Sequence, residues 1–285
     1  MHVAQFPAPG SKVSGSDFYV TGGGCAANAA LAAARLGGRA AFAGPLGEAS
    51  DAVSSRIVAD LESAGIDCRG VVRVPGATAS VSMILIDASG EKSIATRRGH
   101  GLNDGRPADA AALVADADVV LIDNRYPEFQ LPIAHAARAR GVPLVIDVDR
   151  ATTPDDSLLA LGTHVIASSD ALAATTGAHD PAAGLVQLAA HAHGFLAVTG
   201  GAQGVWWREG ERLRHMPAFP VAAIDTLGAG DVFHGGFALA LAETGDVVAA
   251  LRFAAAVAAL KCTHFGGGGG APTRADVDAL LRTRG

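Results

Sequence analysis

The chain has 285 residues, of which 49% are hydrophobic and 18% are charged, and its formal net charge is −6. This length suits one large α/β domain. The negative charge argues against nucleic acid or an anionic membrane surface as the main partner. The three cysteines show no metal-type spacing, and no signal sequence or bilayer-length apolar run is visible. We therefore expect a cytoplasmic protein.

Short apolar runs alternate with Ala- and Leu-rich helical stretches. Residues 39–47 predict a strand and residues 51–65 a helix. Four later runs are apolar throughout, which is typical of strands buried on both faces of a parallel sheet: residues 117–124, 142–149, 163–169 and 194–201. Together they predict a doubly wound, mostly parallel α/β sheet flanked by helices, with ligands bound beyond the carboxyl ends of the strands.

One segment departs from this pattern. Residues 77–99 alternate between apolar and polar side chains and turn at ASGEK, which predicts a β-hairpin. With residues 10–20 it is expected to form a small β-sheet lid on the single domain of residues 1–285. Exposed edges of such strands often pair, so a homodimer is expected.

The glycine run at residues 266–270 predicts a flexible loop.

The stretch DTLGAGD, residues 225–231, places a glycine-rich turn before a long apolar helix. A helix N-terminus attracts anions, and the backbone N–H groups of Gly228, Ala229 and Gly230 can point at one phosphoryl group. Asp231 is either a plain helix cap or a base that takes the proton of an attacking hydroxyl. The turn and the carboxylate together favour phosphoryl transfer.

Two other glycine-rich turns precede or follow apolar elements. In TGGGCAAN, residues 21–28, Asn28 is either an exposed helix residue or an amide that points into a cleft. No acidic residue follows at the spacing that a dinucleotide site needs. VTGGAQG, residues 198–204, is either a plain hairpin turn or a backbone seat for a nucleotide. Neither a P-loop nor the protein-kinase motif set is present in the sequence.

In order and spacing, GGGCAANAALAAARLG, VTGGAQG and DTLGAGDVFHGGF resemble the ribokinase-like (PfkB) carbohydrate kinases over nearly the whole chain. Residues 217–263 look most similar to the sulfofructose kinase branch, which phosphorylates a 6-substituted ketohexose. The resemblance implies a ribokinase-like fold and transfer of the γ-phosphoryl group of ATP to a sugar hydroxyl, with Mg²⁺ as the accompanying ion.

The resemblance also implies roles for individual residues. Asp231 would be the base and would contact the acceptor, and the turn before it would hold the transferred phosphoryl group. In some relatives the segment that Asp225 begins supplies backbone ligands to a monovalent cation such as K⁺. The other implied ligands fall into two sets, one for the sugar and one for ATP: Gly23, Gly24 and Asn28 for the sugar, and Thr199, Gly201 and Gly204 for ATP.

The chain departs from the family pattern in two places. Ser168 and Ala171 stand where relatives carry an Asn-x-x-Glu element that organises Mg²⁺, so the metal ligands are left open between Asp170 and water. Relatives open with a strand that ends in a sugar-binding aspartate, whereas this sequence begins just beyond it. We expect either an earlier start, or a sheet with one strand fewer and a sugar with one ligand fewer. A further possibility is that residues 12–20 take the place of that strand.

Four basic residues are expected near the sugar: Lys12, Arg97, Arg98 and Arg125. Arg125 follows an apolar strand at its carboxyl end, where a guanidinium can hold an anionic group in bidentate fashion. This favours a 6-phosphorylated or 6-sulfonated ketohexose as the acceptor. Two alternatives stay open, a nucleoside kinase of the same family and a non-catalytic sugar- or nucleotide-binding relative.

Overall fold

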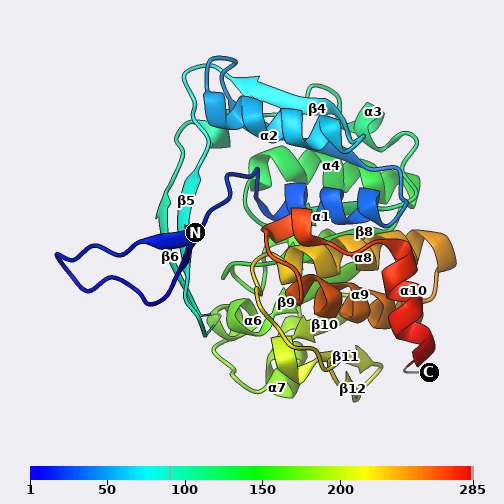
Figure 1. Cartoon of the computed structure of the whole chain (residues 1–285). Coiled ribbons are helices and arrows are strands. Elements are labelled where there is room, and N and C mark those ends of the chain that lie inside the picture. The colour runs from blue at the N-terminus through cyan, green and yellow to red at the C-terminus, as the bar shows by residue number, and fades with distance from the viewer. Residues whose placement is uncertain (90, 284–285) are drawn as a thin grey trace.

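The computed structural model describes residues 1–89 and 91–283 (Figure 1). Its larger sheet has six strands in the order β12-β11-β10-β9-β8-β7. Four neighbouring strands run parallel and match the four predicted apolar runs: β7 (Val120–Asp123), β8 (Leu144–Val148), β9 (His164–Ser168) and β10 (Phe195–Thr199). Two antiparallel strands complete the sheet, β11 (Val205–Glu209) and β12 (Arg212–Met216).

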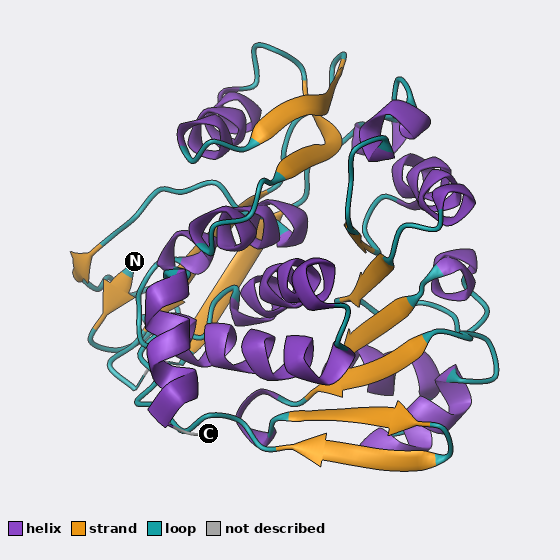
Figure 2. Ribbon diagram, turned by 90° about the vertical axis from the view of Figure 1, so that its right-hand side faces the viewer, coloured by secondary structure: helices purple, strands orange, loops and turns teal. Residues whose placement is uncertain are grey.

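Helices cover both faces of this sheet (Figure 2). One hydrophobic cluster joins alternate strand residues such as Ile166 to four helices: α1 (Cys25–Arg35), α8 (Ala229–Thr244), α9 (Val247–Cys262) and α10 (Arg274–Thr283). The cluster on the other face joins residues such as Val165 to α4 (Pro127–Arg140), α5 (Ser157–Leu161), α6 (Ser169–Thr176) and α7 (Pro181–Leu188). The predicted doubly wound fold is confirmed. Among the described helices, none is long and apolar enough to cross a membrane.

A second, two-stranded parallel sheet pairs β3 (Ala41–Gly47) with β4 (Asp67–Val74). The helix between them, α2 (Ala52–Ser63), begins where Asp51 accepts a hydrogen bond from the backbone N–H of Ser54, 3.0 Å away. Both β3 and α2 were expected, but β4 was not. A short helix, α3 (Ala110–Val114), packs against α4.

The predicted small sheet is present and has the order β2-β1-β5-β6. It is built from β1 (His2–Val3), β2 (Gly15–Asp17), β5 (Val81–Ile86) and β6 (Lys92–Arg97). The predicted hairpin turn includes residue 90, which lies outside the described residues. The idea that residues 12–20 replace a strand of the larger sheet is wrong, because Gly15–Asp17 pairs with β1 in the small sheet. A lid function for this sheet stays a prediction.

The glycine run near the C-terminus is buried rather than a flexible loop, so that expectation is wrong. Residues Gly267–Gly270 form a 3₁₀ turn, η3, and three of the four are buried. The turn packs so closely on α1 that a Cβ on Gly268 would lie 2.7 Å from the Cα of Asn28. Glycine is needed here because it lets one backbone approach another.

Helices α1 and α8 also cross at unusually short range. A Cβ on Gly235 of α8 would lie only 2.3 Å from the backbone oxygen of Ala29 in α1. The glycine therefore lets the two helices touch backbone to backbone, one turn away from Asp231 and next to Asn28. Three segments from distant parts of the chain, α1, α8 and η3, meet at this place.

Candidate active site

The glycine turn predicted to bind a phosphoryl group leads directly into α8. Gly228 caps the helix with φ of 74°, a conformation that strongly favours glycine. The N–H of Ala229 is already used, because it donates to the backbone oxygen of Thr226 at 3.2 Å. Within the described ranges no protein acceptor is found for the N–H groups of Gly228 and Gly230. The first turn of α8 thus offers two of the three expected donors to an anion.

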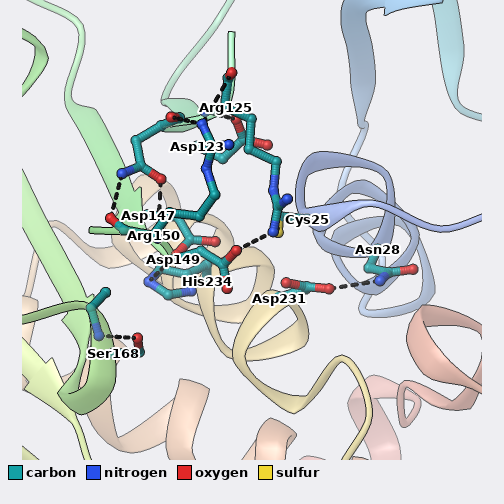
Figure 3. Close-up of polar contacts among 12 residues, drawn as sticks. Cys25, Asn28, Asp123, Arg125, Asp147, Asp149, Arg150, Ser168, Asp231 and His234 are labelled. Carbon is teal, nitrogen blue, oxygen red and sulfur yellow. Dashed lines mark hydrogen bonds and ion pairs between the residues drawn. The ribbon is translucent and has the colours of Figure 1, made fainter. Parts of the chain in front are cut away.

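Asp231 is half-buried in the first turn of α8 and is held by Asn28 (Figure 3). The side-chain Nδ2 of Asn28 donates to Asp231 Oδ2 at 2.6 Å, and its Oδ1 accepts from the backbone N–H of Gly268 at 3.3 Å. Asn28 is only 8% exposed, so the alternative of an exposed helix residue is wrong. Its amide thus links Asp231 to Gly268 and still has one N–H and one lone pair free of these two bonds. A contact between Asn28 and the sugar stays a prediction.

Arg125 reaches the same place from the end of β7. Its Nε lies 3.4 Å from the Sγ of Cys25, and its Nη2 pairs with the carboxylate of Asp149 (Figure 3). Burial raises the pKa of the Cys25 thiol well above its ordinary value, so the group stays protonated. The carboxylate of Asp149 offsets the charge of Arg125. The other predicted basic residues, Lys12, Arg97 and Arg98, are exposed.

A buried Asp147–His234 pair lies behind Asp231, and sequence reasoning did not find it. His234 Nε2 is 3.5 Å from Asp147 Oδ1, and its Nδ1 is 2.8 Å from the backbone oxygen of Gly230. Burial raises the pKa of Asp147 to about 7, against the lowering effect of His234, and nearby Asp231 raises it further. One feature of the sequence could have revealed Asp147. Its carboxylate lies near the carboxyl end of an apolar strand, where ligands bind in such sheets.

The structure brings together a cluster of potential metal ligands, but this cluster does not form a magnesium site. The ligand atoms of Cys25, Asp147 and Asp231 lie within 4.8 Å of each other. Mg²⁺ requires oxygen ligands, whereas this set contains a protonated thiol and a carboxyl group that is half-protonated near pH 7.

The position of the family's Asn-x-x-Glu element fits Mg²⁺ no better. The Oγ of Ser168 accepts from the N–H of Ala171 at 3.2 Å and caps α6. Ala171 is buried and has no polar side chain, and Asp170 is exposed. Neither set of residues therefore fits a protein-bound magnesium ion.

The carboxylate of Asp225, expected beside a monovalent cation, is already paired. Lys261 Nζ lies 3.2 Å from Asp225 Oδ2 and donates to the backbone oxygen of the same residue at 2.9 Å. Both side chains are almost fully buried. A second cation does not fit beside the ammonium group, because the two like charges would repel each other.

The turn predicted to seat ATP is a hairpin between β10 and β11. The N–H of Gly200 donates to the backbone oxygen of Gly204 at 2.8 Å. A Cβ on Gly204 would lie 2.1 Å from the backbone oxygen of Met216, and the residue has a φ of 94°. Close packing and backbone conformation therefore account for this glycine without a ligand. Gly201 is exposed with space around it, and Thr199 is half-buried.

Among the predicted sugar ligands, Gly23 and Gly24 lie exposed before α1.

The model of the pfkB family carbohydrate kinases matches residues 2–274. The chain belongs to this carbohydrate kinase family. The kinase is therefore a phosphotransferase with an alcohol group as acceptor, and the non-catalytic alternative is disfavoured. It is 32% identical to the ribokinase of Bacillus subtilis, over 96% of this chain and 92% of that protein.

Two solved structures confirm the ribokinase-like fold of the kinase. A proposed ribokinase from Agrobacterium tumefaciens is 38% identical and superposes with a TM-score of 0.93, covering 99% of this chain and 93% of that one. The ribokinase of Arabidopsis thaliana, solved with ribose and ATP, is 28% identical and superposes with a TM-score of 0.83. The match covers 99% of this chain and 94% of that one. These relatives do not support the sulfofructose kinase branch in particular.

The raised pKa of Asp147 predicts a pH-dependent stability. The pKa is about 7 in the fold against an ordinary 3.8, so the folded state binds the proton more tightly. This stabilisation is complete below the unfolded pKa and is lost as the pH rises through the folded value. We expect Tm to fall from pH 5 to pH 8 in the wild type and to fall less in Asp147→Asn. Parallel Tm profiles for the two proteins would contradict the assignment.

Proposed function

We propose that the protein is an ATP-dependent sugar kinase, which transfers the γ-phosphoryl group of ATP to a sugar hydroxyl. The observation that carries the proposal is the carboxylate of Asp231, held by Asn28 at 2.6 Å beside the open N–H groups of the glycine turn. The ATP-bound and ribose-bound relative supports both the donor and the class of acceptor. Ribokinase relatives favour a sugar over a nucleoside as the acceptor.

In this proposal each group at the start of α8 has a separate task. Asp231 takes the proton from the sugar hydroxyl, and Asn28 keeps the carboxylate oriented toward it. The N–H groups of Gly228 and Gly230, with the positive end of the helix dipole, stabilise the charge on the transferred phosphoryl group. ATP would lie along the turn that contains Thr199, Gly201 and Gly204. Mg²⁺ would arrive with ATP, bound to its phosphates and to water.

Replacing the base tests the mechanism directly. Asp231→Asn keeps the size of the side chain but removes the proton acceptor, so kcat should fall by roughly 10²–10⁴-fold with a smaller change in KM. Initial rates of ADP release with ribose measure the effect. Asp246→Asn is the matched control, because Asp246 caps α9 through an exposed side chain and asparagine caps equally well. More than about a tenth of wild-type kcat in Asp231→Asn would exclude it as the base.

For the acceptor we propose a neutral sugar of the ribose class. The pairing of Arg125 with Asp149 supports this, because the carboxylate offsets the charge of the guanidinium. Arg125 is the predicted sugar-site cation that contacts Cys25, with its Nε 3.4 Å from the Sγ. The second candidate is a 6-phosphorylated or 6-sulfonated ketohexose. The observation in its favour is the group of exposed basic residues on or near the small sheet, Lys12, Arg97 and Arg98.

Kinetics with two sugars separate these candidates. We expect kcat/KM for ribose to exceed that for fructose 6-phosphate, and Arg125→Ala to change the KM for ribose little. If the acceptor is anionic, Arg125→Ala should raise its KM about 10-fold or more, because a charge-assisted contact is worth about 1.5–3 kcal/mol. Arg106→Ala is the control, since Arg106 pairs with Glu128 on the surface. A preference for fructose 6-phosphate would overturn the neutral assignment.

We further propose that two chains pair through the small sheet. Its strands and the segment after β2 expose several large apolar side chains, and such side chains mark interaction surfaces where they cluster: Phe18, Tyr19, Val20, Val81, Met83 and Ile94. Val81 and Met83 share one face of the hairpin, whereas Ile94, which is paired with Ile84, lies on the other face. Among the described strands, the two outer ones, β2 and β6, are paired on one side only, and a second copy can cover the other side.

Light scattering tests the pairing. The wild type should show about twice the chain mass of 28.5 kDa. Met83→Lys should lower this mass, because it places a charge in the apolar patch, whereas Val186→Lys on α7 should not. A wild-type mass of one chain at micromolar concentration would contradict the proposal.

A further inference from the structure

Lys261 is a fully buried lysine in the last turn of α9. Its Nζ lies 2.9 Å from the backbone oxygen of Asp225 and 3.2 Å from the carboxylate oxygen Oδ2 of the same residue. Lysine is almost never fully buried unless it is paired, because removing an ammonium group from water is costly. Here two oxygens of one residue surround the charge, and the carboxylate that offsets it is only 2% exposed.

Asp225 connects this ammonium group to the candidate active site. Its Oδ1 accepts from the N–H of Leu227 at 2.8 Å, in the turn that precedes Gly228. Its Oδ2 accepts from the N–H of Gly266 at 2.9 Å, where the buried glycine run begins. Burial opposes ionisation of Asp225, but these N–H groups and Lys261 hold its pKa below the ordinary value. One ion pair thus anchors both loops that flank Asp231.

We infer that the ammonium group of Lys261 replaces the monovalent cation expected beside Asp225, so that the protein carries a built-in cation and requires no K⁺. The charge, the contact with a backbone oxygen and the contact with the carboxylate are those that a bound ion would provide. Lys261 is a positioning residue, because it acts on the glycine turn through Asp225. Only the activity arm of the test below rests on the proposed sugar kinase function.

Thermal melts test the inference without any substrate. Wild-type protein is melted in KCl and in tetramethylammonium chloride at equal ionic strength, since tetramethylammonium is too large to enter a buried site. A cation that binds the folded state raises Tm in a saturable way. We expect no K⁺-specific increase in the wild type. A saturable, K⁺-specific increase in its Tm would overturn the inference.

Two variants sharpen the test. Lys261→Ala removes the ammonium group and leaves space beside Asp225, so its Tm should fall and should recover with K⁺ but not with tetramethylammonium. Lys261→Met fills the space without a charge, so its Tm should fall and should not recover. Equal responses of the two variants to K⁺ would also overturn the inference. If neither variant folds, the wild-type melts decide.

The rate of ADP release provides the activity arm. Wild-type turnover should differ by less than about twofold between the two salts, whereas Lys261→Ala should gain about fivefold or more with K⁺, the low end of ordinary coupling between two sites. K⁺ activation of the wild type by fivefold would reject the inference. Absence of turnover in every salt, with the expected melts, would reject the proposed function and leave the built-in cation supported.

Discussion

The backbone contact between α1 and α8 is the constraint on which the rest of the site depends. Gly235 allows α8 to lie against the backbone oxygen of Ala29, and this approach brings Asn28 to within 2.6 Å of Asp231. A larger residue at position 235 would separate the helices and lengthen that hydrogen bond. The geometry of the carboxylate is therefore set by helix packing in the core, which changes little because protein interiors are close-packed.

Two buried pairs of polar side chains hold the glycine turn from opposite sides. His234 contacts Asp147 and also the backbone oxygen of Gly230, while Lys261 acts through Asp225 on the N–H of Leu227. The backbone donors of the turn are thus fixed before any ligand arrives. Donors that need no reorganisation stabilise developing charge most effectively. This arrangement explains why charged residues are buried here despite the cost of removing them from water.

Much of the fold could be predicted because it follows from local patterns. The apolar runs became β7 to β10, and the glycine turn became the cap of α8. β4 was missed because Asp67, Arg69 and Arg73 interrupt its hydrophobic pattern. The partners of Asp147 and Lys261 could not be predicted, since each lies on another element and is met only after folding. The glycine run looked flexible because its composition carries no sign of the helix that it packs against.

The contact between Gly268 and Asn28 joins residues that are 240 positions apart. Chains are synthesised from the N-terminus, so α1 and its neighbours emerge from the ribosome well before the glycine run. Until that run docks, the amide of Asn28 lacks one of the two bonds that fix its orientation. The ability to orient Asp231 is therefore acquired only after the glycine run has emerged and docked on α1. A nascent chain would hold every glycine turn of the site while still being unable to use them together.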